Sequence, residues 1–374
     1  MTKIISQAPG KLFIAGEYAV VSPYQPAVLM AVSSHLTAQL ECQLQGPYQF
    51  ITNQCQHPIH WSFNDQGQVI SSDPAADKFK LIWSVIETIT NYAQSKNRLN
   101  HQAFKLTISS RLDDQSGRKI GLGSSGAVSV AVADCLAQHN GLKAYLSEKD
   151  YQNLLFKIIA ISQSKLGMRG SLGDVACQIT GSLTHYQNFD RNWFNQHLAK
   201  IESKDDLARL IEQDWPGLII KKLSWPENWQ VSIVWSQSPA DTESLLAQST
   251  NSQSAISDTG FKKDSQRQVN KIVQAINEKD WSNFKSTLAA NYQNISHYRA
   301  NQQQIYHTSS FDLAQRLCQG KDTVFKISGA GAGDCALAFS PDLQSKFQVE
   351  KDWQEAGLTV LKLKPNEREE AYYD

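Results

Sequence analysis

Residues 121–127 combine small and hydroxyl side chains in a pattern typical of loops that bind phosphate groups. The segment consists, in order, of Gly121, Leu122, Gly123, Ser124, Ser125, Gly126 and Ala127. An apolar stretch over residues 125–138 follows at once and predicts a buried helix. Glycine lets a backbone approach a ligand closely, and the first turn of a helix offers unpaired N–H groups and a positive dipole end. The pattern predicts a cradle for a polyphosphate, and a serine-capped helix after a flexible turn is the alternative.

This loop differs from two widespread phosphate-binding patterns. It lacks the G-x-x-x-x-G-K-[ST] sequence, and it is not a G-x-G-x-x-G fingerprint between a strand and a helix. Near the N-terminus, Lys11 follows a Pro-Gly pair and precedes an apolar stretch. The pair predicts a turn that presents the lysine at the start of a strand. An exposed lysine at a turn is the ordinary structural alternative.

Two more glycine-rich segments carry polar side chains. Ser171 and Asp174 belong to a Gly-Ser-Leu-Gly-Asp-Val-Ala segment, for which a helix N-cap is the structural alternative. Gly329, Ala330 and Gly331 belong to a Ser-Gly-Ala-Gly-Ala-Gly-Asp segment between two strand-like runs, for which a tight turn is the alternative. Four such segments in one chain favour a shared site for an anionic ligand.

Hydrophobic periodicity indicates the elements that must position these segments. Alternating or β-branched residues predict strands over residues 37–40, 48–52, 59–63, 104–110, 182–186, 231–235, 323–328 and 335–339. A spacing of 3.6 residues predicts helices over residues 75–93, 125–138, 151–164, 264–276 and 281–296. This α+β pattern suggests a first domain over residues 1–210, with the phosphate loop, and a second over residues 211–374, with the C-terminal glycine loop.

Composition narrows the class of protein. The chain has 374 residues, of which 41% are hydrophobic, so it can bury a large core. Its 36 Lys and Arg residues balance 36 Asp and Glu residues, which argues against a protein that coats nucleic acid. The six cysteines include no C-x-x-C pair, and no run approaches the ~20 apolar residues of a membrane span. We expect a soluble, cytoplasmic protein that binds neither membranes nor nucleic acid.

The four segments, in this order and at these separations, resemble those of the GHMP kinases. That family includes galactokinase, homoserine kinase, mevalonate kinase and phosphomevalonate kinase, and the likeness extends from residue 8 to residue 339. The resemblance implies ATP and Mg²⁺ as cofactors. It also implies a two-domain α+β fold, in which an N-terminal domain like the second domain of ribosomal protein S5 precedes a ferredoxin-like C-terminal domain.

Within this family, the chain is most similar to the bacterial phosphomevalonate kinases. Tyr18 stands where mevalonate kinases usually have histidine, and Lys119 precedes the phosphate loop. Residues 186–191 (Tyr-Gln-Asn-Phe-Asp-Arg) and 235–240 (Trp-Ser-Gln-Ser-Pro-Ala) continue the likeness. The resemblance implies transfer of the ATP γ-phosphate to 5-phosphomevalonate by a monomer or homodimer. The alternatives are mevalonate kinase, diphosphomevalonate decarboxylase and a non-catalytic ATP-binding regulator of the same fold.

The resemblance also implies roles for four polar residues. A phosphate acceptor has a second pKa of ~6, so it is mostly a dianion at neutral pH and needs cations more than a strong base. We therefore expect Lys119 to clamp the acceptor or the transferring phosphoryl group, and Ser171 to hydrogen-bond the acceptor. Lys11 would hold substrate or orient Asp174. For Asp174, the conventional base of the family, we expect a positioning role in an ion pair with Lys11.

Further expectations concern the substrate, the metal and two departures from the family pattern. Tyr18 and residues 329–331 would contact the substrate. Ala332 replaces a glycine of the C-terminal loop, and its methyl group disfavours a positive φ angle there. Gln163 stands where some relatives have a magnesium-binding glutamate. We therefore expect Mg²⁺ to rest on Ser125, the ATP phosphates and water.

Overall fold

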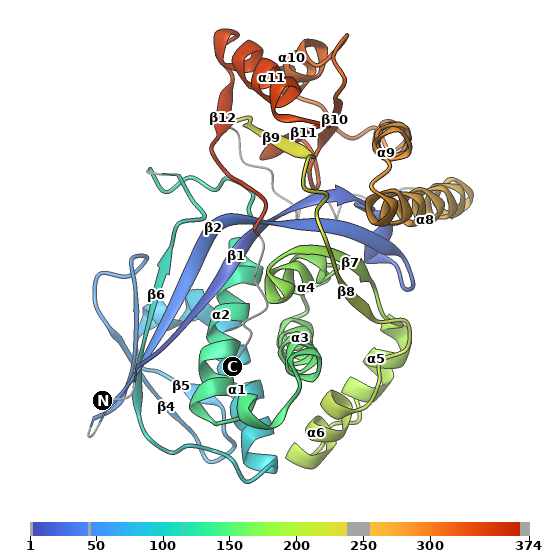
Figure 1. Cartoon of the computed structure of the whole chain (residues 1–374). Coiled ribbons are helices and arrows are strands. Elements are labelled where there is room, and N and C mark those ends of the chain that lie inside the picture. The colour runs from blue at the N-terminus through green and yellow to red at the C-terminus, as the bar shows by residue number, and fades with distance from the viewer. Residues whose placement is uncertain (1–2, 44–45, 115, 238–254, 367–374) are drawn as a thin grey trace.

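The computed structural model describes residues 3–43, 46–114, 116–237 and 255–366, and these form two domains, each with its own sheet (Figure 1). Strands of the first sheet are β1 (Lys3–Ala15), β2 (Pro26–Cys42), β3 (Tyr48–Thr52), β4 (Ile59–Phe63), β5 (Val69–Ile70), β6 (Phe104–Ser110), β7 (Leu183–Gln187) and β8 (Ile219–Leu223). Their order is β5-β4-β3-β6-β2-β7-β8, and β1 pairs with β2 beside this path. Every strand that the sequence predicts in this part of the chain is present.

Helices cover one face of the first sheet (Figure 1). The helical elements of this domain are η1 (Ala19–Val21), η2 (Pro74–Phe79), α1 (Lys80–Ser95), α2 (Ser124–His139), η3 (Lys143–Tyr145), α3 (Glu148–Lys165), α4 (Gly173–Thr180), α5 (Arg191–Leu198) and α6 (Lys204–Glu212). Helix α2 packs against β1, β2, α1, α3 and α4, which explains why its sequence is apolar on all sides. This central position holds its first turn, and so the phosphate loop, in a fixed place.

The second domain has a four-stranded antiparallel sheet. Its elements are β9 (Gln230–Trp235), α8 (Ala255–Glu278), α9 (Trp281–Asn301), α10 (Ser309–Leu317), β10 (Val324–Ile327), β11 (Cys335–Ser340), α11 (Leu343–Glu355) and β12 (Thr359–Leu361). The order β10-β11-β9-β12, with helices between the first and second and between the third and fourth strands in the chain, is the ferredoxin-like arrangement. The α+β, two-domain expectation is thus confirmed.

The change of sheet falls later in the chain than the boundary expected after residue 210. Strand β8 pairs with β7 from Leu183↔Leu223 to Gln187↔Ile219, so it completes the first sheet. Strand β9 pairs with β11 and β12 of the second sheet. The chain therefore passes from one sheet to the other between Leu223 and Gln230.

The Pro-Gly pair before Lys11 forms a β-bulge, which corrects the predicted turn. Strand β1 continues through it, and its pairing with β2 shifts register between Pro9 and Gly10. A β-carbon on Gly10 would lie 3.0 Å from the β-carbon of Leu122, so the absent side chain lets β1 pack closely on the phosphate loop. The chain forms a continuous strand instead of a turn because β1 pairs with β2 on both sides of the register shift.

Within the described ranges, no helix is long and apolar enough to cross a membrane. The Trp-Ser-Gln-Ser-Pro-Ala segment, whose likeness to the family was noted above, covers residues 235–240. Its last three residues, 238–240, lie outside the described residues.

Candidate active site

The phosphate loop enters α2 through two glycines in left-handed conformations. Gly121 has a φ angle of 88° and Gly123 one of 78°, and α2 begins at Ser124. The loop is held from two sides, since the Leu122 carbonyl accepts from the Lys11 N–H at 3.0 Å and the Gly123 carbonyl accepts from the Gln178 side-chain amide at 2.8 Å. The geometry is that of a preformed anion cradle at a helix N-terminus.

Lys11 and Asp174 approach this loop from β1 and α4. A β-carbon on Gly123 would lie 2.8 Å from Cε of Lys11, and one on Gly126 would lie 2.9 Å from Oδ2 of Asp174. The Lys11 ammonium donates to the Gly121 carbonyl at 3.4 Å. Among the described residues, no salt bridge within 4.0 Å joins Lys11 to Asp174, so the expected ion pair is not formed. The ammonium bonds instead to the loop carbonyl, and the Asp174 carboxylate lies against the first turn of α2.

Helix α4 places the Ser171–Asp174 segment beside the first turn of α2. Leu172, its N-cap residue, has a φ angle of 66°, and Asp174 lies in the first turn. The Ser171 hydroxyl accepts from the Gly173 N–H at 3.3 Å, which closes a short turn before the helix. Because Leu172 is the N-cap residue and its side chain makes no capping hydrogen bond, the N-cap alternative with Ser171 or Asp174 is not what the structure contains. The two helix N-termini therefore meet at the cradle, and their dipoles add positive potential there.

The C-terminal glycine loop reaches the same place from the second domain. A β-carbon on Gly121 would lie 2.6 Å from Oδ2 of Asp334, so the Asp334 side chain covers that glycine. The Cys335 thiol donates to the Ile120 carbonyl at 3.2 Å. On β1, the Phe13 N–H donates to the Ser328 hydroxyl at 2.8 Å. Sequence reasoning did not single out Asp334, although its position directly after the glycines was a usable signal.

Ala332 adopts the conformation that its methyl group disfavours. Its φ angle is 60°, and its N–H donates to the Tyr306 carbonyl at 2.9 Å. A β-carbon on the neighbouring Gly331 would lie 2.8 Å from that same carbonyl oxygen, so the loop packs tightly on Tyr306. The loop therefore keeps its left-handed turn in spite of the substitution, at the cost of local backbone strain.

Tyr18 joins the two domains at the edge of the site. Its hydroxyl donates to the Ala330 carbonyl, and its ring lies under the Arg299 guanidinium, 4.5 Å from the ring centroid. Burial raises the pKa of Tyr18 well above its ordinary value, so the hydroxyl keeps its proton at neutral pH. The structure thus brings Tyr18 together with one of the residues expected to contact substrate.

The neighbouring Glu17 forms a buried ion pair that the sequence did not reveal. Its carboxylate pairs with the ammonium of Lys326 on β10; the side chains are 3% and 0% exposed. The same carboxylate oxygen accepts from the Gly329 N–H at 3.2 Å. Lys326 also donates to the Ile327 carbonyl at 2.9 Å. The pair therefore fixes the start of the C-terminal loop to the first domain.

Lys119 lies on an exposed hairpin that leads into the phosphate loop. It forms an isolated antiparallel bridge with Asp113, and Asp114 folds the turn by accepting from Arg118 and Ser116. These hydrogen bonds lower the pKa of Asp114 to about 2. In the described part of the chain, no hydrogen bond or salt bridge links Lys119 to Lys11, Ser171 or Asp174. Its side chain is exposed and lies near the Asp113 carboxyl group.

The oxygen donors for a cation are few. Ser125 is exposed in the first turn of α2. Asp174, in the first turn of α4, has its carboxylate against Gly126 of α2. Gln163 is 7% exposed within α3. No group of three or more His, Cys, Asp or Glu residues capable of holding a metal occurs within the described ranges. One hydroxyl and one carboxylate suit Mg²⁺, which keeps several water ligands and takes others from phosphates.

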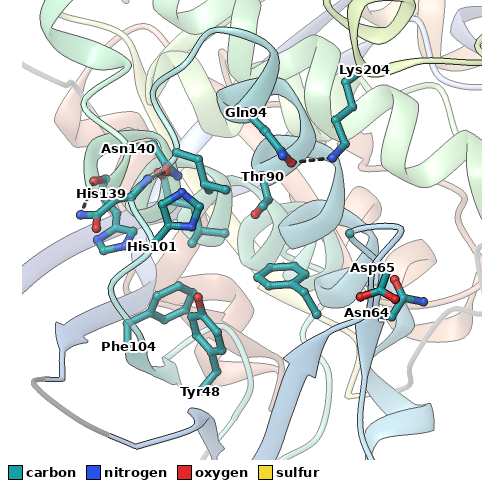
Figure 2. A pocket seen from close by; sticks show the side chains of 15 residues that line it. Tyr48, Asn64, Asp65, Thr90, Gln94, His101, Phe104, His139, Asn140 and Lys204 are labelled. Atoms are coloured by element: carbon teal, nitrogen blue, oxygen red, sulfur yellow. Dashed lines mark hydrogen bonds between the residues drawn. The ribbon is translucent and has the colours of Figure 1, made fainter.

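A separate pocket lies at the other end of α2 (Figure 2). It has a volume of about 220 Å³, and His139 and Asn140 at the C-terminal end of α2 line it together with Tyr48 and His101. A 16-residue helix is roughly 24 Å long, so this pocket is remote from the phosphate loop. It takes no part in the site described above.

Comparisons with known proteins agree with this geometry. A family model described as "GHMP kinases N terminal domain" matches residues 80–182, and one described as "GHMP kinases C terminal" matches residues 272–358. The chain is 30% identical to a phosphomevalonate kinase from Streptomyces sp. (strain CL190), with 97% of each chain covered.

Two solved structures are also similar over the full length. A protein from Listeria innocua has a TM-score of 0.87 at 27% identity, with 98% of each chain covered. The phosphomevalonate kinase of Streptococcus pneumoniae, solved in complex with phosphomevalonate and AMPPNP, has a TM-score of 0.82 at 25% identity. That likeness covers 97% of this chain and 99% of the other.

Proposed function

The chain belongs to the GHMP kinases and is an ATP-dependent kinase; from this premise we propose that its acceptor is 5-phosphomevalonate, which it converts to 5-diphosphomevalonate. The observation that carries the proposal is the pair of full-length likenesses to phosphomevalonate kinases, at 30% and 25% identity. Tyr18, held against the C-terminal glycine loop, supports it, because the resemblance associates histidine at this position with mevalonate kinases.

The charges of the site suit a reaction between two phosphate groups. An acceptor dianion repels the triphosphate of ATP, so the enzyme must supply positive potential where the two meet. Two helix N-termini and the Lys11 ammonium converge on the cradle, with Asp174 as the carboxylate nearest to the first turn of α2. Backbone N–H groups of the loop would bind the ATP phosphates in this arrangement.

We assign the remaining roles on the same physical grounds. The Lys119 side chain reorients from its exposed hairpin toward the phosphate groups and neutralises the acceptor or the transferring phosphoryl group. Ser171 hydrogen-bonds the acceptor. Asp174 orients the reactants and does not act as a general base, because the acceptor phosphate is already ionised. Ser125 offers a hydroxyl that would hold Mg²⁺, and a bound cation would neutralise the phosphate oxygens. Tyr18 and residues 329–331 close the acceptor side from the second domain.

A coupled assay of ADP release tests the acceptor. The purified protein is given ATP and Mg²⁺ with mevalonate, 5-phosphomevalonate or galactose in parallel reactions. We expect turnover with 5-phosphomevalonate alone. Activity on mevalonate without activity on its phosphate would identify a mevalonate kinase, and nucleotide binding without turnover of any acceptor would identify a regulator.

A further inference from the structure

Two side chains, one at the end of β7 and one at the start of α5, hold the segment that carries Ser171. The Tyr186 hydroxyl donates to the Ser171 carbonyl at 2.7 Å, and the Arg191 guanidinium donates to the Gly170 carbonyl at 2.8 Å. Tyr186 is fully buried. The proposed chemistry uses neither side chain, although both belong to the Tyr-Gln-Asn-Phe-Asp-Arg segment whose likeness to the family was noted above.

Asn188, between them, connects this segment to the one that follows Tyr18. Its side chain is fully buried, and its amide nitrogen donates to the carbonyls of Val20 at 2.8 Å and Val21 at 3.1 Å. Its amide oxygen accepts from Nε of Arg191 at 3.2 Å, and it also lies 3.2 Å from the Tyr186 hydroxyl, whose single proton is given mainly to the nearer Ser171 carbonyl. Two carbonyl acceptors on the nitrogen side and the Arg191 donor on the oxygen side fix the orientation of the amide.

The hydrogen bonds of this network end next to two strained residues. Tyr18, which precedes η1, has φ and ψ angles of 63° and −52°, and Leu172, which follows Ser171, has a φ angle of 66°. Such conformations cost energy in residues that carry a side chain and persist only where the surroundings determine them. The Val20, Val21 and Ser171 carbonyls are therefore held where the backbone would otherwise relax.

We propose that Tyr186, Asn188 and Arg191 are positioning residues that set the spacing between Tyr18 and Ser171 and thereby shape the acceptor side of the site. This inference rests on the proposed function for the identity of the acceptor. Among the described residues, none of the three side chains has a hydrogen bond to residues 121–127, so we expect the network to act on acceptor binding more than on the phosphate loop. Loss of one link lets one strained segment relax and misplaces its acceptor-binding group.

Tyr186→Phe is the most discriminating variant, because it removes one hydroxyl and keeps the buried ring. The Ser171 carbonyl then loses its donor. We expect the KM for the acceptor to rise about tenfold, which corresponds to one buried hydrogen bond, while the KM for ATP changes less than twofold. Arg191→Lys keeps a cation that can donate to the Gly170 carbonyl. It should therefore raise the KM for the acceptor less than Arg191→Ala does.

Tyr151→Phe provides the matched control. Tyr151 is also buried, at 3% exposed, and its hydroxyl donates to Asp134 on α2, outside this network. Tyr151→Phe should lower the melting temperature and leave the ratio of the KM for the acceptor to the KM for ATP unchanged. Equal behaviour of Tyr186→Phe and Tyr151→Phe, with no acceptor-specific change, would overturn the proposal and leave the network a purely structural role.

Asn188→Asp tests the link to Tyr18, and its binding is measured on folded protein because the buried carboxyl group will also lower stability. The change is isosteric but places an oxygen against the Val20 and Val21 carbonyls. Binding of acceptor alone, measured by calorimetry on the folded fraction, should weaken at least tenfold while binding of a non-hydrolysable ATP analogue is unchanged. Equal weakening of both ligands would refute the assignment.

These measurements separate the two proposals. If the wild-type enzyme uses another acceptor, the proposed function fails, and the KM comparison is made with that acceptor. An acceptor-specific effect would then still support the positioning role, whereas its absence with 5-phosphomevalonate as confirmed substrate would refute the positioning role alone.

Discussion

Lys326→Met should destabilise the protein far more than its position outside the catalytic machinery suggests. The substitution removes the ammonium that pairs with Glu17 and leaves a carboxylate 3% exposed. One hydrogen bond to it would remain, from the Gly329 N–H at 3.2 Å, since its second oxygen has no hydrogen-bond partner among the described residues. Breaking a buried pair in this way costs about 3–5 kcal/mol, because an uncompensated charge stays in the interior.

The double variant Glu17→Gln/Lys326→Met separates charge from packing. Burial lowers the pKa of Lys326 while Glu17 opposes that shift, so each charge depends on the other. Removing both should cost less than Lys326→Met alone, and the coupling energy of the double-mutant cycle should be about 3 kcal/mol.

Urea unfolding followed by circular dichroism supplies the free energies for this cycle. Lys351→Met is the control, because Lys351 pairs with Glu355 on the surface and that pair is worth at most about 1 kcal/mol. The reasoning is refuted if the double variant is as unstable as Lys326→Met, or if Lys326→Met behaves like the surface control.

Three further outcomes test the site. In ADP-release assays, Lys119→Ala should lose more kcat than Asp174→Asn; the opposite ranking, with loss of the acidic limb of the pH profile in Asp174→Asn, would restore a general-base role. Gly126→Ala should lower kcat at least ~10-fold, because its β-carbon would displace the Gln178 side chain that holds the Gly123 carbonyl and would lie 2.9 Å from Oδ2 of Asp174, while Gly260→Ala, with open space at its β-carbon, should leave kcat unchanged. Ala332→Gly should raise the free energy of unfolding by up to about 1 kcal/mol in urea titrations, since its φ angle of 60° suits glycine; a loss of stability would contradict the strain at this loop.

Local sequence rules located the phosphate loop and most elements correctly. The helix predicted over residues 125–138 is α2, which spans Ser124–His139, and the strand predicted over residues 104–110 is β6. The glycines of the loop also signalled the left-handed turns that the structure contains at Gly121 and Gly123. Such rules work because backbone preference and hydrophobic periodicity are properties of neighbouring residues.

The same rules failed where distant strands decide a local conformation. A Pro-Gly pair favours a turn, yet β1 continues through residues 9 and 10 because β2 pairs with it on both sides of a bulge. Likewise, β8, with the sequence Ile-Ile-Lys-Lys-Leu, was not predicted as a strand, and the expected boundary placed it in the second domain. Only its pairing with β7 assigns it to the first sheet.

The sequence by itself determined which residues can cradle phosphate, because glycine freedom and a helix N-terminus need no distant partner. Only the tertiary structure decided which charges face that cradle and which hold the domains together. Glu17 and Lys326 are 309 positions apart, and no local sequence pattern predicts that they form an ion pair. Lys11 and Asp174, expected to pair, lie over the loop without a salt bridge between them. Burial and charge pairing arise when folded elements dock, and no local pattern encodes that geometry.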